Sequence, residues 1–176
     1  MPTMPFSRLQ QATLVVLRTL VGWHFLYEGY TKLLFPAWGQ NGAPVPPWSS
    51  AAYLKAATGP LAFSFHWMGN APWIGSLDLL VAVALTAVGV SLMLGYFTQT
   101  GCAVALALLT MFYLAAIPTG RLDARAEGTY LLVNKTLIEA GAVAVLFACR
   151  TGSMAGFDRL WRPAPTARAS MKEAAV

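Results

Sequence analysis

The sequence predicts an all-α integral membrane protein, a bundle of four transmembrane helices with a long Trp-rich interfacial loop between the first two. Hydrophobic residues make up 57% of the 176 residues and charged residues only 11%, whereas a soluble domain carries about 25% charged residues. A core this apolar has too little polar surface to cover it in water. Four separate segments also have the roughly 20 mostly apolar residues needed to cross a bilayer.

Proline and glycine set the ends of the four expected helices, which cover residues 11–35, 73–94, 98–117 and 129–149. Pro36 ends the first, because the residue before a proline is pushed out of the helical region. The second begins after Pro72 and ends at Gly95, and the third ends before Pro118. The intervening turn is short, so the second and third helices should form an antiparallel hairpin.

The long connection between the first two helices, residues 36–72, is rich in Pro, Gly and Trp. Its tryptophans are Trp38, Trp48 and Trp67, a residue type that prefers the lipid headgroup region. Ser49 or Ser50 is suited to cap a short helix over residues 51–57, and residues 63–68 resemble a second interfacial piece. We expect this loop to lie on the membrane as a lid or collar; an ordinary covered loop with aromatic packing is the alternative.

The distribution of Lys and Arg predicts the orientation, because cytoplasmic flanks of membrane proteins carry an excess of these residues. The side with both termini carries six, namely Arg8, Arg150, Arg159, Arg162, Arg168 and Lys172, and the other side three, namely Lys55, Arg121 and Arg125. We therefore expect a multi-pass domain at residues 11–149 in the inner (plasma) membrane, with residues 1–10 and the basic tail, residues 150–176, in the cytoplasm. The basic flank indicates contact with anionic lipid, not nucleic acid, and the tail itself is expected to be solvated and disordered.

Ionisable residues inside the expected helices are informative, since each costs about 2.5–3.5 kcal/mol in a transmembrane helix on insertion scales. The first helix carries Arg18, His24, Glu28 and Lys32, which fall within one third of the helix circumference at about 100° per residue. This helix is therefore expected to turn a polar face into the bundle. The opposite face presents Leu and Val to lipid.

The fourth helix repeats the pattern with Asn134, Lys135 and Glu139, and the second contributes Asp78. Buried charges must be paired or neutralised, and helix depth at about 1.5 Å per residue indicates the pairs. Arg18 and Glu139 lie at depths where they can meet. A second cluster is expected in the outer half, formed by Glu28, Lys32, Asp78 and Lys135, with His24 between the two clusters.

Two interpretations of these charges remain open. Paired charges can serve the fold by fixing which helices are neighbours, or they can form a polar site for a small ligand, a quinone headgroup or a proton. A metal site is not expected, because His24 and His66 lie on different segments without ligand spacing. Cys102 and Cys149 are expected to be small packing residues at the reducing, cytoplasmic ends of their helices.

Several motifs are similar to those of the DoxX family, near its DoxD branch, the small subunit of thiosulfate:quinone oxidoreductase. They lie at residues 17–33, 48–68, 127–139 and 156–159, and the likeness spans nearly the whole chain. The Val-Asn-Lys of residues 133–135 and Leu-Ile-Glu of residues 137–139 are the most specific part. The matching polar positions are Arg18, Glu28, Gly29, Lys32, Asn134, Lys135 and Glu139.

The resemblance implies a four-helix membrane subunit of a quinone-linked oxidoreductase, acting on thiosulfate or a related sulfur donor together with a partner subunit. Under this hypothesis Glu28, His24 and Glu139 are the catalytic residues, and Glu28 or His24 carries protons. Substrate or a quinone carbonyl would be bound by Arg18, Lys32, Asp78, Asn134 and Lys135. A non-enzymatic scaffold or accessory subunit is the alternative, and a small-solute carrier is a third hypothesis, disfavoured because transporters are usually larger and built from repeats.

Overall fold

The protein is all-α in its architecture, as the sequence predicts. The structure, a computed structural model, describes residues 6–34, 48–117, 129–130 and 132–159. The helices in these ranges are α1 (Arg8–Leu34), α2 (Ala51–Lys55), α3 (Ala62–Gly69), α4 (Ile74–Leu94), α5 (Thr98–Ala115) and α6 (Lys135–Ala148). The smaller elements are β1 (Thr129–Tyr130), which pairs antiparallel with β2 (Val133–Asn134), and the 3₁₀ turns η2 (Thr151–Ser153) and η3 (Phe157–Arg159).

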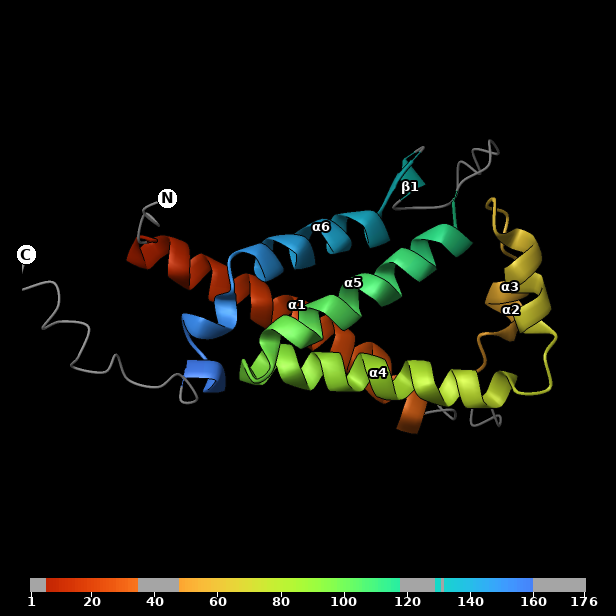
Figure 1. Cartoon of the computed structure of the whole chain (residues 1–176), viewed down its shortest axis with the longest axis horizontal. Helices are drawn as coiled ribbons and strands as arrows, with labels where there is room; N and C mark the ends of the chain where they lie inside the picture. Colours follow the sequence, from red (N-terminus) through yellow and green to blue (C-terminus); the bar gives the residue numbers. More distant parts are fainter. Residues whose placement is uncertain (1–5, 35–47, 118–128, 131, 160–176) are drawn as a thin grey trace, which may run out of the picture.

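Four long helices pack on one another, α1 on α4, α4 on α5, α5 on α6 and α6 on α1. Figure 1 shows that the start of α1, the α4–α5 turn, η2 and η3 gather at one end of this arrangement, while α2 and α3 lie at the opposite end. We call these the tail end and the cap end, and we call α2 with α3 the cap. The elements at the two ends enclose two different polar clusters.

Among the described residues, two helices, α4 and α5, are long and apolar enough to cross a membrane. Gly95 ends α4 with a φ of 65°, the left-handed conformation that glycine adopts without strain. Large apolar side chains such as Leu79, Leu80 and Val83 point outward from α4 and are exposed. This outward apolar surface agrees with the membrane character predicted from the composition.

Helix α6 is shorter than predicted. It begins at Lys135 and has 14 residues, which at about 1.5 Å per residue gives a length of roughly 21 Å. The predicted start at residue 129 is wrong, because β1 (Thr129–Tyr130) and β2 (Val133–Asn134) pair as strands before the helix begins. Asn134 caps the helix: its side-chain oxygen accepts a hydrogen bond of 2.9 Å from the backbone N–H of Leu137. Asparagine is among the best residues for this position.

The α1–α4 contact is unusually close because glycines line it. A Cβ on Gly29 would lie 2.5 Å from the Thr86 backbone nitrogen, and one on Gly89 would lie 2.4 Å from the Leu26 nitrogen. Gly22 faces Met93 in the same antiparallel register. Small residues that let helix backbones approach in this way are typical of membrane helix pairs.

The start of the basic tail is folded, contrary to the expectation of a solvated end. Thr151 and Gly152 are buried, and η2 packs against α1 and α5. Helix α1 also begins at Arg8, within the segment expected to precede it. Residues 160–176, residues 118–128 and Trp38 lie outside the described residues, and the expectations for them remain predictions.

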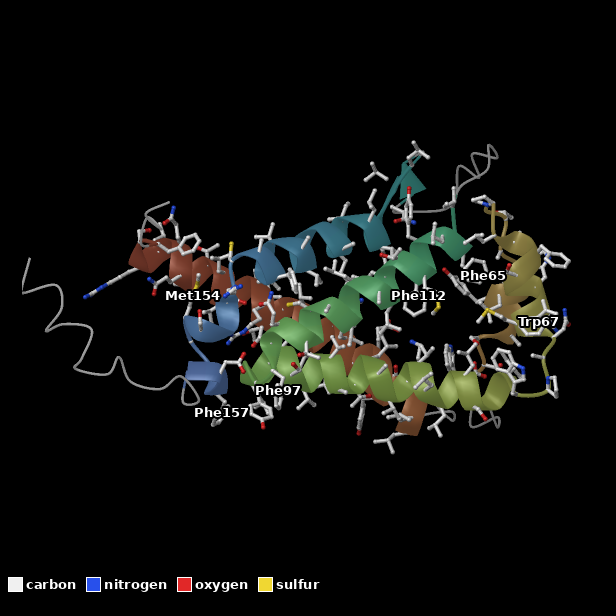
Figure 2. The ribbon with its side chains drawn as sticks, in the orientation of Figure 1. Phe65, Trp67, Phe97, Phe112, Met154 and Phe157 are labelled. Atoms are coloured by element: carbon white, nitrogen blue, oxygen red, sulfur yellow. The ribbon has the colours of Figure 1, made fainter. Side chains whose placement is uncertain are left out.

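The cap contains the short helix expected near residues 51–57, which is α2, and the second interfacial piece expected at residues 63–68 is also a helix, α3. Leu54 and Phe65 from the cap form an apolar cluster with Ala115 of α5, and Ile74 and Leu77 of α4 pack against it. Figure 2 shows Phe65 and Phe112 at this end of the molecule, and Phe97, Met154 and Phe157 at the tail end. The cap is thereby fixed to α4 and α5.

Candidate functional site: a capped cavity with one charged wall

A cavity of about 320 Å³ lies between the four long helices beneath the cap. This volume is at the lower end of the range for small-molecule sites, roughly 300–1,000 Å³. Five of the eight residues singled out in the sequence line it, namely His24, Glu28, Lys32, Lys135 and Glu139. The structure therefore brings together all three of the expected catalytic residues, His24, Glu28 and Glu139.

The ionisable side chains come from α1 and α6 and form one wall. His24 Nε2 lies 3.5 Å from Glu139 Oε1, with side-chain exposures of 42% and 17%. Because His24 is on α1 and Glu139 on α6, this pair bridges the two helices. An imidazole beside a carboxylate can act in general acid–base catalysis, so the pair has the chemistry of a proton donor and acceptor.

Closer to the cap, Lys32 and Glu28 form an ion pair one turn apart on α1. The Lys32 ammonium also donates a 3.3 Å hydrogen bond to the Glu28 carbonyl and lies 5.1 Å from the centre of the Trp48 ring, a cation–π contact. Lys135 of α6 attracts Glu28 and Glu139 and, within the described ranges, forms no ion pair of its own. It is the cation at this wall with the least local compensation.

The facing wall is apolar. Leu85 of α4 and Phe112 of α5 line the cavity together with Phe25, Val81 and Leu109. A ligand here would meet side chains without polar atoms on one side and ionisable groups on the other. Such a division orients an amphipathic ring, because its apolar face and its polar substituents favour opposite walls.

The cap is tied to the helices by side-chain hydrogen bonds that sequence reasoning did not identify. Ser50 donates through its backbone N–H (2.9 Å) and its hydroxyl to Asp78 Oδ1, and Tyr53 donates to the Phe112 carbonyl at 2.9 Å. Asp78 is thus not part of the cation cluster expected in the outer half. The signal that was available is the polar Asp78 on an otherwise apolar helix, which required a partner.

Arg18 lies in a separate cluster at the tail end, and the expected Arg18–Glu139 pair is wrong. Arg18 is 3% exposed, donates a 3.0 Å hydrogen bond to the Thr151 carbonyl and is attracted by Asp158. The Asp158 carboxylate accepts hydrogen bonds from the backbone N–H groups of Phe97 (2.7 Å) and Thr98 (2.9 Å). Depth along each helix suggested the wrong partner, because the fold-back of η2 and η3 was not foreseen.

Asn134, like Arg18 and Asp78, does not line the cavity, since its side chain serves as the α6 cap. Three of the five expected substrate-binding residues therefore have positions in which they hold elements together. Lys32 and Lys135 remain as the basic groups that can contact a ligand. Among the described residues, no group of three or more His, Cys, Asp or Glu side chains could hold a metal ion.

Comparisons with protein-family models, with curated proteins and with solved structures found no match. The cavity, with its two contrasting walls and its position under the cap, is therefore the feature of the molecule that points to a function.

Proposed function

We propose that this chain is the membrane subunit of a quinone-linked oxidoreductase, similar to the DoxX family, and that the cavity binds the quinone ring. The observation that carries the proposal is the cavity beneath the cap, in which an apolar wall faces the His24–Glu139 pair. A quinone needs both, because its ring is apolar and its reduction and oxidation move protons. Thiosulfate or a related sulfur compound is the proposed electron donor, handled by a partner subunit.

Each side of the cavity has a role under this proposal. The ring would lie against Leu85 and Phe112, where burial of apolar surface contributes about 25 cal/mol per Å². Lys135 would donate a hydrogen bond to a ring carbonyl, a charge-assisted contact stronger than a neutral one. His24, held by Glu139, would pass a proton to or from the same end of the ring, while Glu28 and Lys32 would balance the charge.

The proposal also places α1, α4, α5 and α6 across the inner membrane with both termini in the cytoplasm. The close glycine contacts between α1 and α4 support this membrane orientation. It is also supported by the position of the start of α1 and of η3 at the same end of the bundle (Figure 1). The 27 residues of α1 give about 40 Å, more than the roughly 30 Å hydrocarbon core. The shorter α6 would reach the outer headgroups through its hairpin.

The test is a mild-detergent pull-down of the tagged chain, with mass spectrometry of bound proteins and lipids. We expect a redox partner and quinone in the wild-type preparation. In Leu85→Trp the larger side chain fills the cavity, and quinone should be lost. The matched control on the same helix is Leu80→Trp, whose side chain points outward and which should retain quinone. Recovery in an unrelated assembly without quinone would reject the enzyme and favour the scaffold hypothesis.

A further inference from the structure

The cavity and the Arg18 cluster are separated by a closely packed apolar layer. The layer, which we call the plug, consists of the buried core residues Val21, Val88, Leu92, Cys102, Ala105, Val143 and Leu146. Four of the seven, namely Leu92, Cys102, Val143 and Leu146, are among the largest fully buried side chains of the described residues. Interiors packed in this way leave no room for a continuous file of water.

The helix segments that cross the plug carry a single titratable side chain. They are residues 19–23, 86–94, 99–108 and 140–148, and Cys102 is their only titratable side chain. His24 lies six positions after Arg18 on α1, which corresponds to a rise of about 9 Å along the helix. The cavity is therefore closed toward the tail end.

Toward the cap end, the sides of the cavity differ. Between α4 and α5 it is closed by the apolar cluster around Leu54, Phe65 and Ala115. Between α1 and α6 the wall consists of charged side chains, arranged from the cap inward as Lys32, then Glu28 with Lys135, then His24 with Glu139. His24 and Glu28 remain about two-fifths exposed at the side chain.

Exposing the charged side chains of this wall to lipid acyl chains would cost too much free energy. We therefore expect water to solvate them. Resting on the membrane orientation of the proposed function, we infer that the α1–α6 cleft is a water-filled path leading from the outer aqueous phase to the His24–Glu139 pair. The path ends at the plug. Protons, and the polar end of a ligand, can therefore enter and leave the cavity only from the aqueous phase on the cap side. His24 is faced along this path by Glu28 on its own helix and by Glu139 and Lys135 on α6.

Cysteine labelling in sealed vesicles of both orientations tests this path without any quinone. In a Cys102→Ala/Cys149→Ala background, a membrane-impermeant maleimide is applied from one side at a time. The reporters are Thr136→Cys, which lines the cavity and keeps every charged group, and His24→Cys at its deep end. We expect both to be labelled from one side only, and Thr136→Cys carries the test if the His24 variant does not fold.

Three matched positions identify the sides. Ser64→Cys on exposed α3 marks the cap side, Ala155→Cys marks the tail side, and Ala105→Cys lies in the plug. The reporters should react with maleimide applied from the side that labels Ser64→Cys. Ala105→Cys should react at least about 100-fold more slowly from either side, because a buried thiol reacts only through local opening. Labelling from the Ala155 side, from both sides, or only by a membrane-permeant maleimide would overturn the inference. Quinone binding can fail while this labelling pattern holds, so the two proposals are tested separately.

Discussion

The two polar clusters of this bundle use similar residue types in opposite ways. At the tail end, Arg18 and Asp158 bond to backbone groups of other segments and Arg18 is almost fully buried. At the cap end, His24, Glu28, Lys32 and Glu139 pair with one another along a cavity and remain partly exposed. Charges that bond to the backbone fix the fold, whereas charges that pair beside empty space are available for a ligand.

The tail-end cluster fastens three parts of the chain together. Asp158 occupies the position of an N-terminal cap for α5, because it accepts from the Phe97 and Thr98 N–H groups, and its own N–H donates to the Gly95 carbonyl at 2.9 Å. Arg18 of α1 bonds to Thr151 in η2. The α4–α5 turn, the start of the tail and α1 are thus held in one arrangement.

The largest effect is expected from Asp158→Ala. It removes the α5 cap and leaves the buried Arg18 without the carboxylate that attracts it, so the free energy of unfolding should fall by about 3 kcal/mol or more. Thermal unfolding in detergent measures the loss, and Asp158→Asn, which keeps one acceptor oxygen, should recover part of it. A loss below about 1 kcal/mol would mean that the tail-end cluster contributes no more to stability than an ion pair on a protein surface.

Two glycines of α4 sharpen the contrast between a closely packed contact and open space. A Cβ on Gly89 would meet the Leu26 backbone, whereas one on Gly75 would meet nothing within 4 Å. Gly89→Ala should therefore destabilise the protein by about 1–3 kcal/mol through overpacking. Gly75→Ala should be neutral or stabilise by about 0.5–1 kcal/mol, because alanine favours helix. Equal melting temperatures for the two variants would contradict the close α1–α4 approach.

At the cap end, Glu139→Gln should separate stability from binding. A partly exposed pair contributes at most about 1 kcal/mol to folding, so the melting temperature should change little. Loss of the partner that orients His24 should nevertheless weaken quinone binding by about tenfold, equivalent to roughly 1.4 kcal/mol. Titration of tryptophan fluorescence with a short-chain quinone measures it. A destabilisation as large as that of Asp158→Ala, with unchanged binding, would reverse the roles given to the two clusters.

The local parts of this structure could be predicted from the sequence. Pro72 and Gly95 placed the ends of α4 to within a residue or two, because they act on the backbone directly. The hairpin of α4 and α5 and the first helix of the cap, α2, followed from similar signals. The face shared by His24, Glu28 and Lys32 also followed, since helical periodicity depends only on spacing.

The long-range parts could not be predicted in this way. The partner of Arg18 lies 133 residues away in η2, and no periodicity reports that η2 folds back on α1. The start of α6 was missed although Asn134 offered a capping signal, because the apolar residues before it looked like a continuation of the helix. The sequence also favours a cluster of Asp78 with lysines, whereas Asp78 accepts hydrogen bonds from Ser50, at the start of α2.

The smallest effect is expected from Tyr53→Phe, which removes the hydrogen bond from the cap to the Phe112 carbonyl and should cost about 1 kcal/mol near pH 7. Partial burial raises the pKa of Tyr53 above its ordinary value of 10.0. The folded state therefore holds this proton more tightly than the unfolded chain, and its contribution to stability is complete below pH 10 and declines as pH rises through the folded-state pKa. Melting temperatures between pH 8 and pH 11 should accordingly fall less steeply in Tyr53→Phe than in the wild type. Parallel curves would mean that the Tyr53 hydroxyl has no part in holding the cap over the cavity.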